Sequence, residues 1–236
     1  MQYMLIPLNQ HFDGGLGATG EAFEEAANLL SNSEDARANN IHLPINFLYR
    51  HAIELYLKSM IVILHRALCI PYGGHPHVGS GFVLTKGKWK PIHNVHSLAT
   101  LWAYFLELTH NHKNELEKRC RTDWQEIPDG LDSAINEIEQ ADASSTLFRY
   151  PDERRPDADK AKSSWKPKTP EEMFSHAASG GKPVKAFLVL RSDDSISQSF
   201  QYDDAPLAEL SKLLAETASI LSGAHTGLRV ELADGF

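Results

Sequence analysis

The most constraining feature of the sequence is the run INFLYRHAIELYLKSMIVIL at residues 45–64, which is apolar on nearly every side of a helix. It also carries Arg50, His51, Glu54 and Lys58, which fall within an arc of about 100° at roughly 100° per residue. A helix that is apolar all round lies in a core, where charged groups have to be paired. The run therefore predicts a buried central helix with one narrow polar stripe.

Size and composition are those of one soluble domain with insertions. The chain has 236 residues, and its net charge of −8 excludes a uniformly basic nucleic-acid-binding protein, although local basic patches stay open. Cys69 and Cys120 form no CxxC motif, which rules out a disulfide scaffold and favours a reducing compartment. The first residues do not resemble a signal peptide, and no apolar run is long enough to cross a bilayer. We therefore expect a cytoplasmic protein that does not associate with membranes.

Apolar periodicity and helix-stop residues predict a mainly α protein. Helices are expected at residues 21–30, 44–68, 96–112, 131–140 and 207–222. Thr19 and Asn94 are the expected N-caps of the first and third helices, and Gly223 is the expected stop of the last. Residues 115–124 either extend the third helix or form a short separate one. Short connections between four to five helices favour an up-and-down bundle.

A first insertion, residues 71–93, interrupts the helical pattern after the long helix. It is rich in Gly, Pro and His, and within it residues 82–84 and 88–90 flank a Lys86-Gly87 turn. This pattern predicts a small β-hairpin.

A second insertion covers residues 154–203. Its first part, rich in Lys, Pro, Asp and Ser, is expected to pack loosely. Residues 186–191 and 197–202 predict a second hairpin. Before this insertion, Pro151 favours an extended conformation for the preceding residues. The whole chain, residues 1–236, is thus expected to form one helical domain with two insertions.

The polar stripe of the long helix has two interpretations. Arg50, Glu54 and Lys58 are spaced four residues apart, so they can form a self-satisfied ladder that orients the helix. Alternatively, the stripe is one wall of a polar cleft that faces His96 and Arg149. In such a cleft a histidine can accept a proton while an arginine holds a phosphodiester. The candidate catalytic residues are Arg50, His51, Glu54, His96 and Arg149.

Three short motifs in order resemble the HEPN superfamily of bacterial helical domains, in the layout RHxxELxLK, HxLxxLW and FRYPxD. The matching positions are Arg50, His51, Glu54, Leu55, Leu57, Lys58, His96, Leu98, Leu101, Trp102, Phe148, Arg149, Tyr150, Pro151 and Asp152. The resemblance covers about residues 40–155. It implies an all-α up-and-down bundle that often forms homodimers. It also implies a role as an RNase or RNA-binding component in toxin–antitoxin, abortive-infection or other phage-defence systems, with a partner protein encoded nearby.

The catalytic signature of HEPN RNases is an Arg followed by a His after four to six residues, near the start of a late helix. The chain departs from this pattern, since its only literal match is Arg37 and His42 in the linker before the long helix. Two functions therefore stay open. One is a metal-independent endoribonuclease in which His51 or His96 is the base and Arg50 or Arg149 stabilises the negative charge that develops on the phosphate. The other is a non-catalytic interaction or dimerisation module.

The remaining motifs are weaker indications of function. The pairs His75/His77 and His93/His96 have spacings that suit zinc, but there is no HExxH motif, so we expect no metal and no cofactor and keep a zinc hydrolase only as a third alternative. His96 lies where a helix is expected to begin, a position that favours the neutral ring. The basic tract at residues 160–168, which contains a Trp, has a composition that can bind a nucleic-acid backbone.

Overall fold

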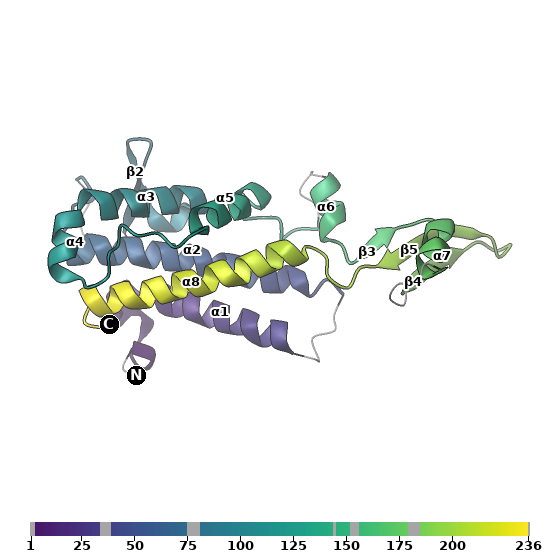
Figure 1. Cartoon of the computed structure of the whole chain (residues 1–236), viewed down its shortest axis with the longest axis horizontal. Helices are drawn as coiled ribbons and strands as arrows, with labels where there is room; N and C mark the ends of the chain where they lie inside the picture. The colour runs from purple at the N-terminus through teal and green to yellow at the C-terminus, as the bar shows by residue number, and fades with distance from the viewer. Residues whose placement is uncertain are drawn as a thin grey trace.

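The long apolar helix α2 (His42–Ala67) is the centre of the fold, as the computed structural model of the chain shows (Figure 1). Helices α1, α3 and α8 pack against it, and α5 bridges α3 and α8. The structure describes residues 3–33, 39–74, 81–143, 145–151, 156–178 and 185–235. The polar stripe lies inside this body, since Arg50, Glu54 and Lys58 are all buried.

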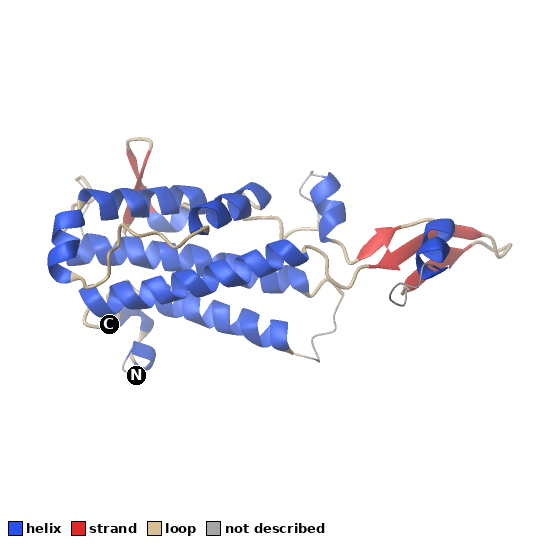
Figure 2. Cartoon of the chain, in the orientation of Figure 1, coloured by secondary structure: helices blue, strands red, loops and turns tan. Residues whose placement is uncertain are grey.

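The described residues form eight α-helices and two small antiparallel sheets (Figure 2). The helices are α1 (Leu16–Asn32), α2 (His42–Ala67), α3 (Leu98–Asn111), α4 (Lys113–Arg119), α5 (Leu131–Ala141), α6 (Pro156–Lys162), α7 (Pro170–Ala178) and α8 (Ala208–Leu232). The strands are β1 (Phe82–Thr85), β2 (Lys88–Pro91), β3 (Trp165–Pro167), β4 (Ala186–Leu190) and β5 (Ile196–Tyr202). Single 3₁₀ turns lie at Tyr3–Leu5, Leu8–Gln10 and Ile92–Asn94. The prediction of a mainly helical protein with β-hairpin insertions is confirmed.

Helix α1 begins earlier than expected because of an aspartate that precedes it. The Asp13 carboxylate accepts hydrogen bonds from the backbone N–H groups of Gly15 at 2.8 Å and Gly17 at 2.6 Å. These bonds satisfy N–H groups that a helix N-terminus leaves without partners. Gly15 supplies the left-handed conformation (φ 86°) that brings the chain into the helix. Thr19, the predicted cap, lies inside α1 and donates to the carbonyl of Gly15.

The ends of α3 and α8 also differ from the prediction. Ser97 caps α3, because its hydroxyl accepts from the N–H of Thr100, whereas Asn94 lies in a separate 3₁₀ turn. Helix α8 continues through Gly223 for two more turns. Its apolar face continues with Leu228 and Leu232, both buried, and this packing outweighs the roughly 1 kcal/mol that a glycine costs inside a helix.

The segment before Pro151 is a turn rather than an extended strand. The N–H groups of Arg149 and Tyr150 both donate to the carbonyl of Thr146. The Asp142 carboxylate accepts from the N–H groups of Thr146 and Leu147 and so fixes the start of the turn. The prediction was wrong because it weighed only the proline, and not the side-chain acceptor that closes the turn.

The first hairpin is confirmed, with its turn at Lys86-Gly87. Thr85 pairs with Lys88 across a two-residue loop in which Lys86 (φ 49°) and Gly87 (φ 74°) both have positive φ. Two positive φ angles define the type I′ turn, whose twist matches that of the flanking strands. In Figure 1 this hairpin projects from the body beside α3.

The second insertion is more ordered than expected. Residues 156–178 contain α6, β3 and α7, and β3 joins the predicted hairpin to give a sheet of order β3-β5-β4. Trp165 of β3 explains the added strand, because its ring packs against Tyr202 at 5.0 Å. This sheet with α7, here named the sheet arm, lies at one end of the molecule, beyond the helical body (Figure 2).

Both cysteines are free, as expected. Among the described residues, the helices are all either too short or too polar to cross a membrane.

A second buried polar cluster lies where the N-terminal residues cross α8. His225 is fully buried, and its ring nitrogens are 4.0 Å from the carboxylates of Asp13 and Glu21. Neither nitrogen makes a hydrogen bond to a described residue. Burial lowers the pKa of His225 to about 4, because the effects of Arg229 and His11 add to desolvation and only Asp13 opposes them.

This cluster makes stability depend on pH. In the folded protein His225 stays neutral down to about pH 4, whereas in the unfolded chain it takes up a proton below about pH 6.5. The free energy of unfolding is therefore highest above pH 6.5 and falls as the pH is lowered toward 4. We expect the free energy of unfolding to fall by roughly 2–3 kcal/mol over this range from His225 alone. His225→Leu should remove that part of the dependence in urea titrations at several pH values. Equal pH dependence of the wild-type protein and the variant would contradict this origin.

Candidate functional site

The polar stripe folds back on itself inside the body. Glu54 accepts from Lys58 Nζ at 2.7 Å through Oε1 and from Arg50 Nη1 at 3.3 Å through Oε2. The three residues are spaced four apart on α2, so their side chains meet on one face. Arg50 is 0% exposed, Glu54 1% and Lys58 4%. The ladder that the sequence predicts is therefore present and is buried.

Two residues from other elements complete this arrangement. Arg50 Nη2 donates to the carbonyl of His96 at 2.8 Å, and Arg50 Nε lies 3.7 Å from the carboxylate of Asp142. The arginine thus ties α2 to the segment before α3 and to the residue that follows α5. We call Arg50, Glu54, Lys58, His96 and Asp142 the Glu54 network. Sequence reasoning missed Asp142, since nothing in its local pattern indicates a partner 92 residues away.

Glu54 fixes the tautomer of His96. Burial by itself raises the pKa of Glu54, but Lys58, Arg50 and His96 outweigh burial, so the pKa lies below its ordinary value. An ionised carboxylate only accepts hydrogen bonds. Because His96 Nδ1 is 3.0 Å from Glu54 Oε1, Nδ1 must carry the proton, which leaves the other nitrogen, Nε2, as the basic one. Nε2 has no hydrogen-bond partner among the described residues.

His96 is also the point where the buried network reaches the surface. Its side chain is 51% exposed and lines a groove of about 980 Å³ between the β1–β2 hairpin and α3, named here the hairpin groove. The polar residues that line it include Lys86, Lys88, Lys90, Thr100 and Glu107. A basic nitrogen held by a buried carboxylate at the wall of a groove is the arrangement of a general base.

The other two candidate residues, His51 and Arg149, lie apart from the Glu54 network. The ring of His51 stacks on Phe47 and meets the edge of Phe23. Burial lowers the pKa of His51, and Nδ1 is buried without a hydrogen bond. The guanidinium of Arg149 lies over the ring of Phe47, 5.0 Å from its centre, and donates to Ser145. The structure therefore brings Arg50, Glu54 and His96 together and places His51 and Arg149 in an adjoining aromatic cluster.

Among the described residues, no three histidine, cysteine or acidic side chains lie close enough together to hold a metal ion. His75, His77 and Arg37 lie outside the described residues. His42, the expected partner of Arg37, contacts the carbonyl of Lys162 at 2.7 Å through its Nε2. That contact makes His42 part of the junction with α6.

The basic tract at residues 160–168 serves mainly to hold the second insertion together. Lys162 is buried, and its ammonium donates to the carbonyls of Leu147 and Tyr150. Lys166 donates to two carbonyls of α6, and Trp165 packs within the sheet arm. These contacts engage Lys162, Lys166 and Trp165, whereas Lys160 and Lys168 of the same tract are exposed.

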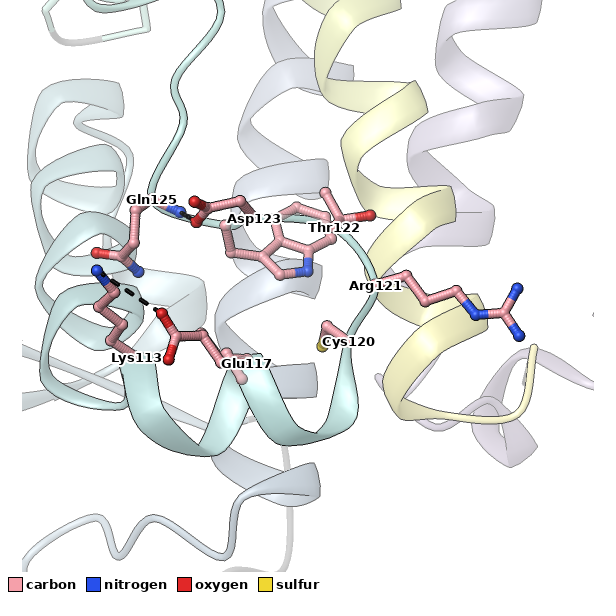
Figure 3. Close-up of a pocket in the computed structure, with 9 residues that line it drawn as sticks. Lys113, Glu117, Cys120, Arg121, Thr122, Asp123 and Gln125 are labelled. Carbon is pink, nitrogen blue, oxygen red and sulfur yellow. Dashed lines mark hydrogen bonds and ion pairs between the residues drawn. The ribbon is translucent and has the colours of Figure 1, made fainter.

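Figure 3 shows a smaller cavity of about 170 Å³ beside α4, lined by Lys113, Glu117, Cys120 and the loop that follows. Burial raises the pKa of Cys120 to about 11, so its thiol is not a nucleophile near neutral pH. Glu231 of α8 accepts from the N–H groups of Arg121 and Thr122 and holds the loop in place. The polar groups that line this cavity hold the loop in place, and its cysteine is not reactive near neutral pH.

Comparisons with protein-family models, with curated proteins and with solved structures return no match. The expectation of a HEPN-like protein thus rests on the motifs given above. Two of those motifs, around Glu54 and His96, are joined in space by the Glu54 network.

The network should matter for stability far more than an exposed ion pair. Arg50→Met leaves the carbonyl of His96 without its buried donor and removes the cation beside the carboxylates of Glu54 and Asp142, so we expect a loss of about 3–5 kcal/mol in the free energy of unfolding. Lys113→Met, which breaks an exposed pair with Glu117 at 3.7 Å, is the control and should change it by less than about 1 kcal/mol. Guanidinium denaturation measures both. Similar losses in the two variants would show that the Glu54 network does not hold the body together.

Proposed function

We propose that the chain is a HEPN-like protein that cleaves RNA without a metal ion, with His96 as the base. The observation that carries the proposal is the bond between His96 Nδ1 and the buried, ionised Glu54, at the wall of an open groove. Such a bond fixes the tautomer and stabilises the imidazolium that forms when Nε2 accepts a proton. Glu54 is then a positioning residue, and His96 is the group that touches the substrate.

The reaction follows from what a single base can do. His96 Nε2 takes the proton from a ribose 2′-OH, and O2′ forms a bond to the adjacent phosphorus. The bond from phosphorus to O5′ breaks, the leaving O5′ takes a proton from water, and His96 returns its proton to solvent. The products are a 2′,3′-cyclic phosphate and a 5′-hydroxyl. The step needs no metal to generate the nucleophile, because the nucleophile is part of the RNA.

Burial changes the roles of the other candidates. Arg50 is fully enclosed, and its donors face Glu54, His96 and Asp142, so we assign it the positioning of His96 instead of contact with phosphate. His51 and Arg149 lie outside the hairpin groove. The proposal includes the finer expectations from the resemblance: an up-and-down bundle formed by α1, α2, α3, α5 and α8, a cytoplasmic location, and a role in toxin–antitoxin or phage defence with a partner protein encoded nearby.

The test is cleavage of a single-stranded RNA oligonucleotide by the full-length protein in EDTA. We expect products with a 2′,3′-cyclic phosphate and a 5′-hydroxyl, and a rate that falls about 100-fold or more in His96→Ala, the usual contribution of a general base. His51→Ala, confirmed folded by its melting temperature, should retain cleavage. Absence of cleavage by the wild-type protein, products with a 5′-phosphate, or an active His96→Ala would each contradict the proposal.

A second candidate function is dimerisation through the sheet arm, and the exposed strand β4 favours it. β4 is an edge strand, since the sheet order is β3-β5-β4, and all five of its residues are apolar. Phe187 is 56% exposed, Leu188 42% and Leu190 55%. Natural proteins usually protect such an edge with charges, prolines or covering elements. An antiparallel edge pairs with a second copy of itself about a two-fold axis, which gives a closed homodimer.

Sedimentation equilibrium tests this interface. We expect the wild-type protein to be a dimer at micromolar concentration and Leu188→Lys to be a monomer, because a charge on the edge strand prevents pairing. The control is Leu29→Lys, a change at a site on α1 that is 67% exposed, which should stay dimeric. A monomeric wild-type protein, or a dimeric Leu188→Lys, would rule out this mode of association.

A further inference from the structure

We infer that the β1–β2 hairpin grips the phosphate backbone of single-stranded RNA through Lys86, Lys88 and Lys90 and presents it to His96. The inference rests on the proposed function, since it names the substrate contact of the same groove. It also adds a binding surface that the catalytic residues do not include.

The three lysines are uncompensated in a chain of net charge −8. All three are exposed, and none makes an ion pair or a side-chain hydrogen bond with another described residue. Three other exposed lysines contrast with them, since Lys113, Lys118 and Lys212 each lie within 4 Å of a glutamate. Within the described lining of the hairpin groove the sole carboxylate is Glu107. The groove therefore has a local positive charge, which contrasts with the negative net charge of the chain.

The hairpin holds these charges in a fixed row. The type I′ turn places Lys86 at the tip, and residues two apart on one strand are about 6.6–6.8 Å apart and share a side, as Lys88 and Lys90 do. Trp89, between them, packs among the rings of His65, Tyr72 and Tyr104. The strand is thus anchored by its inner residue while the two flanking lysines stay in water.

The groove connects this row of charge to the proposed base. The same groove is lined by the lysines, by His96 and by the hydroxyl-bearing Thr100. Lysines on the phosphates and a hydroxyl near the sugar are the contacts that position a nucleic acid without reading its sequence. Its volume of about 980 Å³ is at the upper end for small-molecule pockets, which suits a segment of a polymer.

The arrangement fits one strand better than a duplex. A single row of lysines follows one backbone, whereas proteins that bind double-stranded RNA contact two successive minor grooves across a wide surface. A single strand also leaves the ribose free to adopt the in-line geometry that attack by O2′ needs. Because the lysines contact phosphates only, the grip itself should not distinguish RNA from DNA, and only the cleavage step should need the 2′-OH.

The experiment separates binding from cleavage by using a DNA probe that has no 2′-OH. Fluorescence anisotropy would follow the full-length protein binding a labelled single-stranded DNA of mixed sequence over a range of salt concentrations. The variant is Lys86→Gln/Lys88→Gln/Lys90→Gln. The matched control is Lys113→Gln/Lys118→Gln/Lys212→Gln, which removes the same charge from exposed sites on α4 and α8.

We expect the hairpin variant to bind the probe about 100-fold more weakly than the wild-type protein at about 0.1 M salt. The slope of log K against log salt concentration should also become less steep by about 2, because three phosphate contacts on a single strand are lost. The control should bind as the wild-type protein does, and both variants should melt at the wild-type temperature. Equal affinity of the hairpin variant and the wild-type protein, absence of binding at low salt, or tighter binding of a duplex of the same sequence would each overturn the inference.

The inference and the proposed function fail in different ways. Lysine-dependent binding without any RNA cleavage would contradict the proposed catalysis and support the binding of the phosphate backbone by the hairpin. Cleavage that depends on His96 but is unchanged in the hairpin variant would support the proposed catalysis and contradict the binding role of the hairpin lysines.

Discussion

The buried carboxylate of Glu54 is the interaction on which the arrangement of the body depends. A negative charge in an apolar core is tolerated only when donors surround it, and here they come from Lys58, Arg50 and His96. Arg50 passes the constraint on to Asp142, which in turn closes the turn that follows α5. One charge therefore fixes the relative positions of α2, the start of α3 and the end of α5.

This dependence connects the structural and the functional interpretations of the polar stripe. The stripe is a ladder that orients α2, and the same carboxylate that completes the ladder holds one nitrogen of His96. A rigid support is what a catalytic group requires, because small displacements of a base are costly. The buried part supplies precision, and the exposed ring of His96 is the part that a substrate meets.

Much of the fold could be predicted because local patterns determined it. The apolar run of α2, the short strands β1 and β2, and the face of α5 each carry a signal within a few residues. Two of the errors have a common cause, which is that an unexpected polar group decided the outcome. Asp13 capped α1 in place of Thr19, and Asp142 bent the chain before Pro151.

The candidate site was predictable to a similar degree. The spacing of Arg50, Glu54 and Lys58 indicated a ladder, but the contact with Asp142 depends on tertiary structure and has no local signal. The alternation of lysines around Trp89 was visible in the sequence, yet its meaning depends on the groove that the hairpin and α3 form together.

The contact between the N-terminal residues and α8 has a consequence for synthesis on the ribosome. Asp13 and Glu21 lie beside His225, and α2 shares a long interface with α8, so the helical body cannot close until α8 has emerged. The strands of the sheet arm pair within a much shorter stretch of chain. Local pairing is faster than contacts between distant segments, so the arm can form first while α1 and α2 wait with an apolar face uncovered. That interval is when the nascent protein most needs protection from association with other chains.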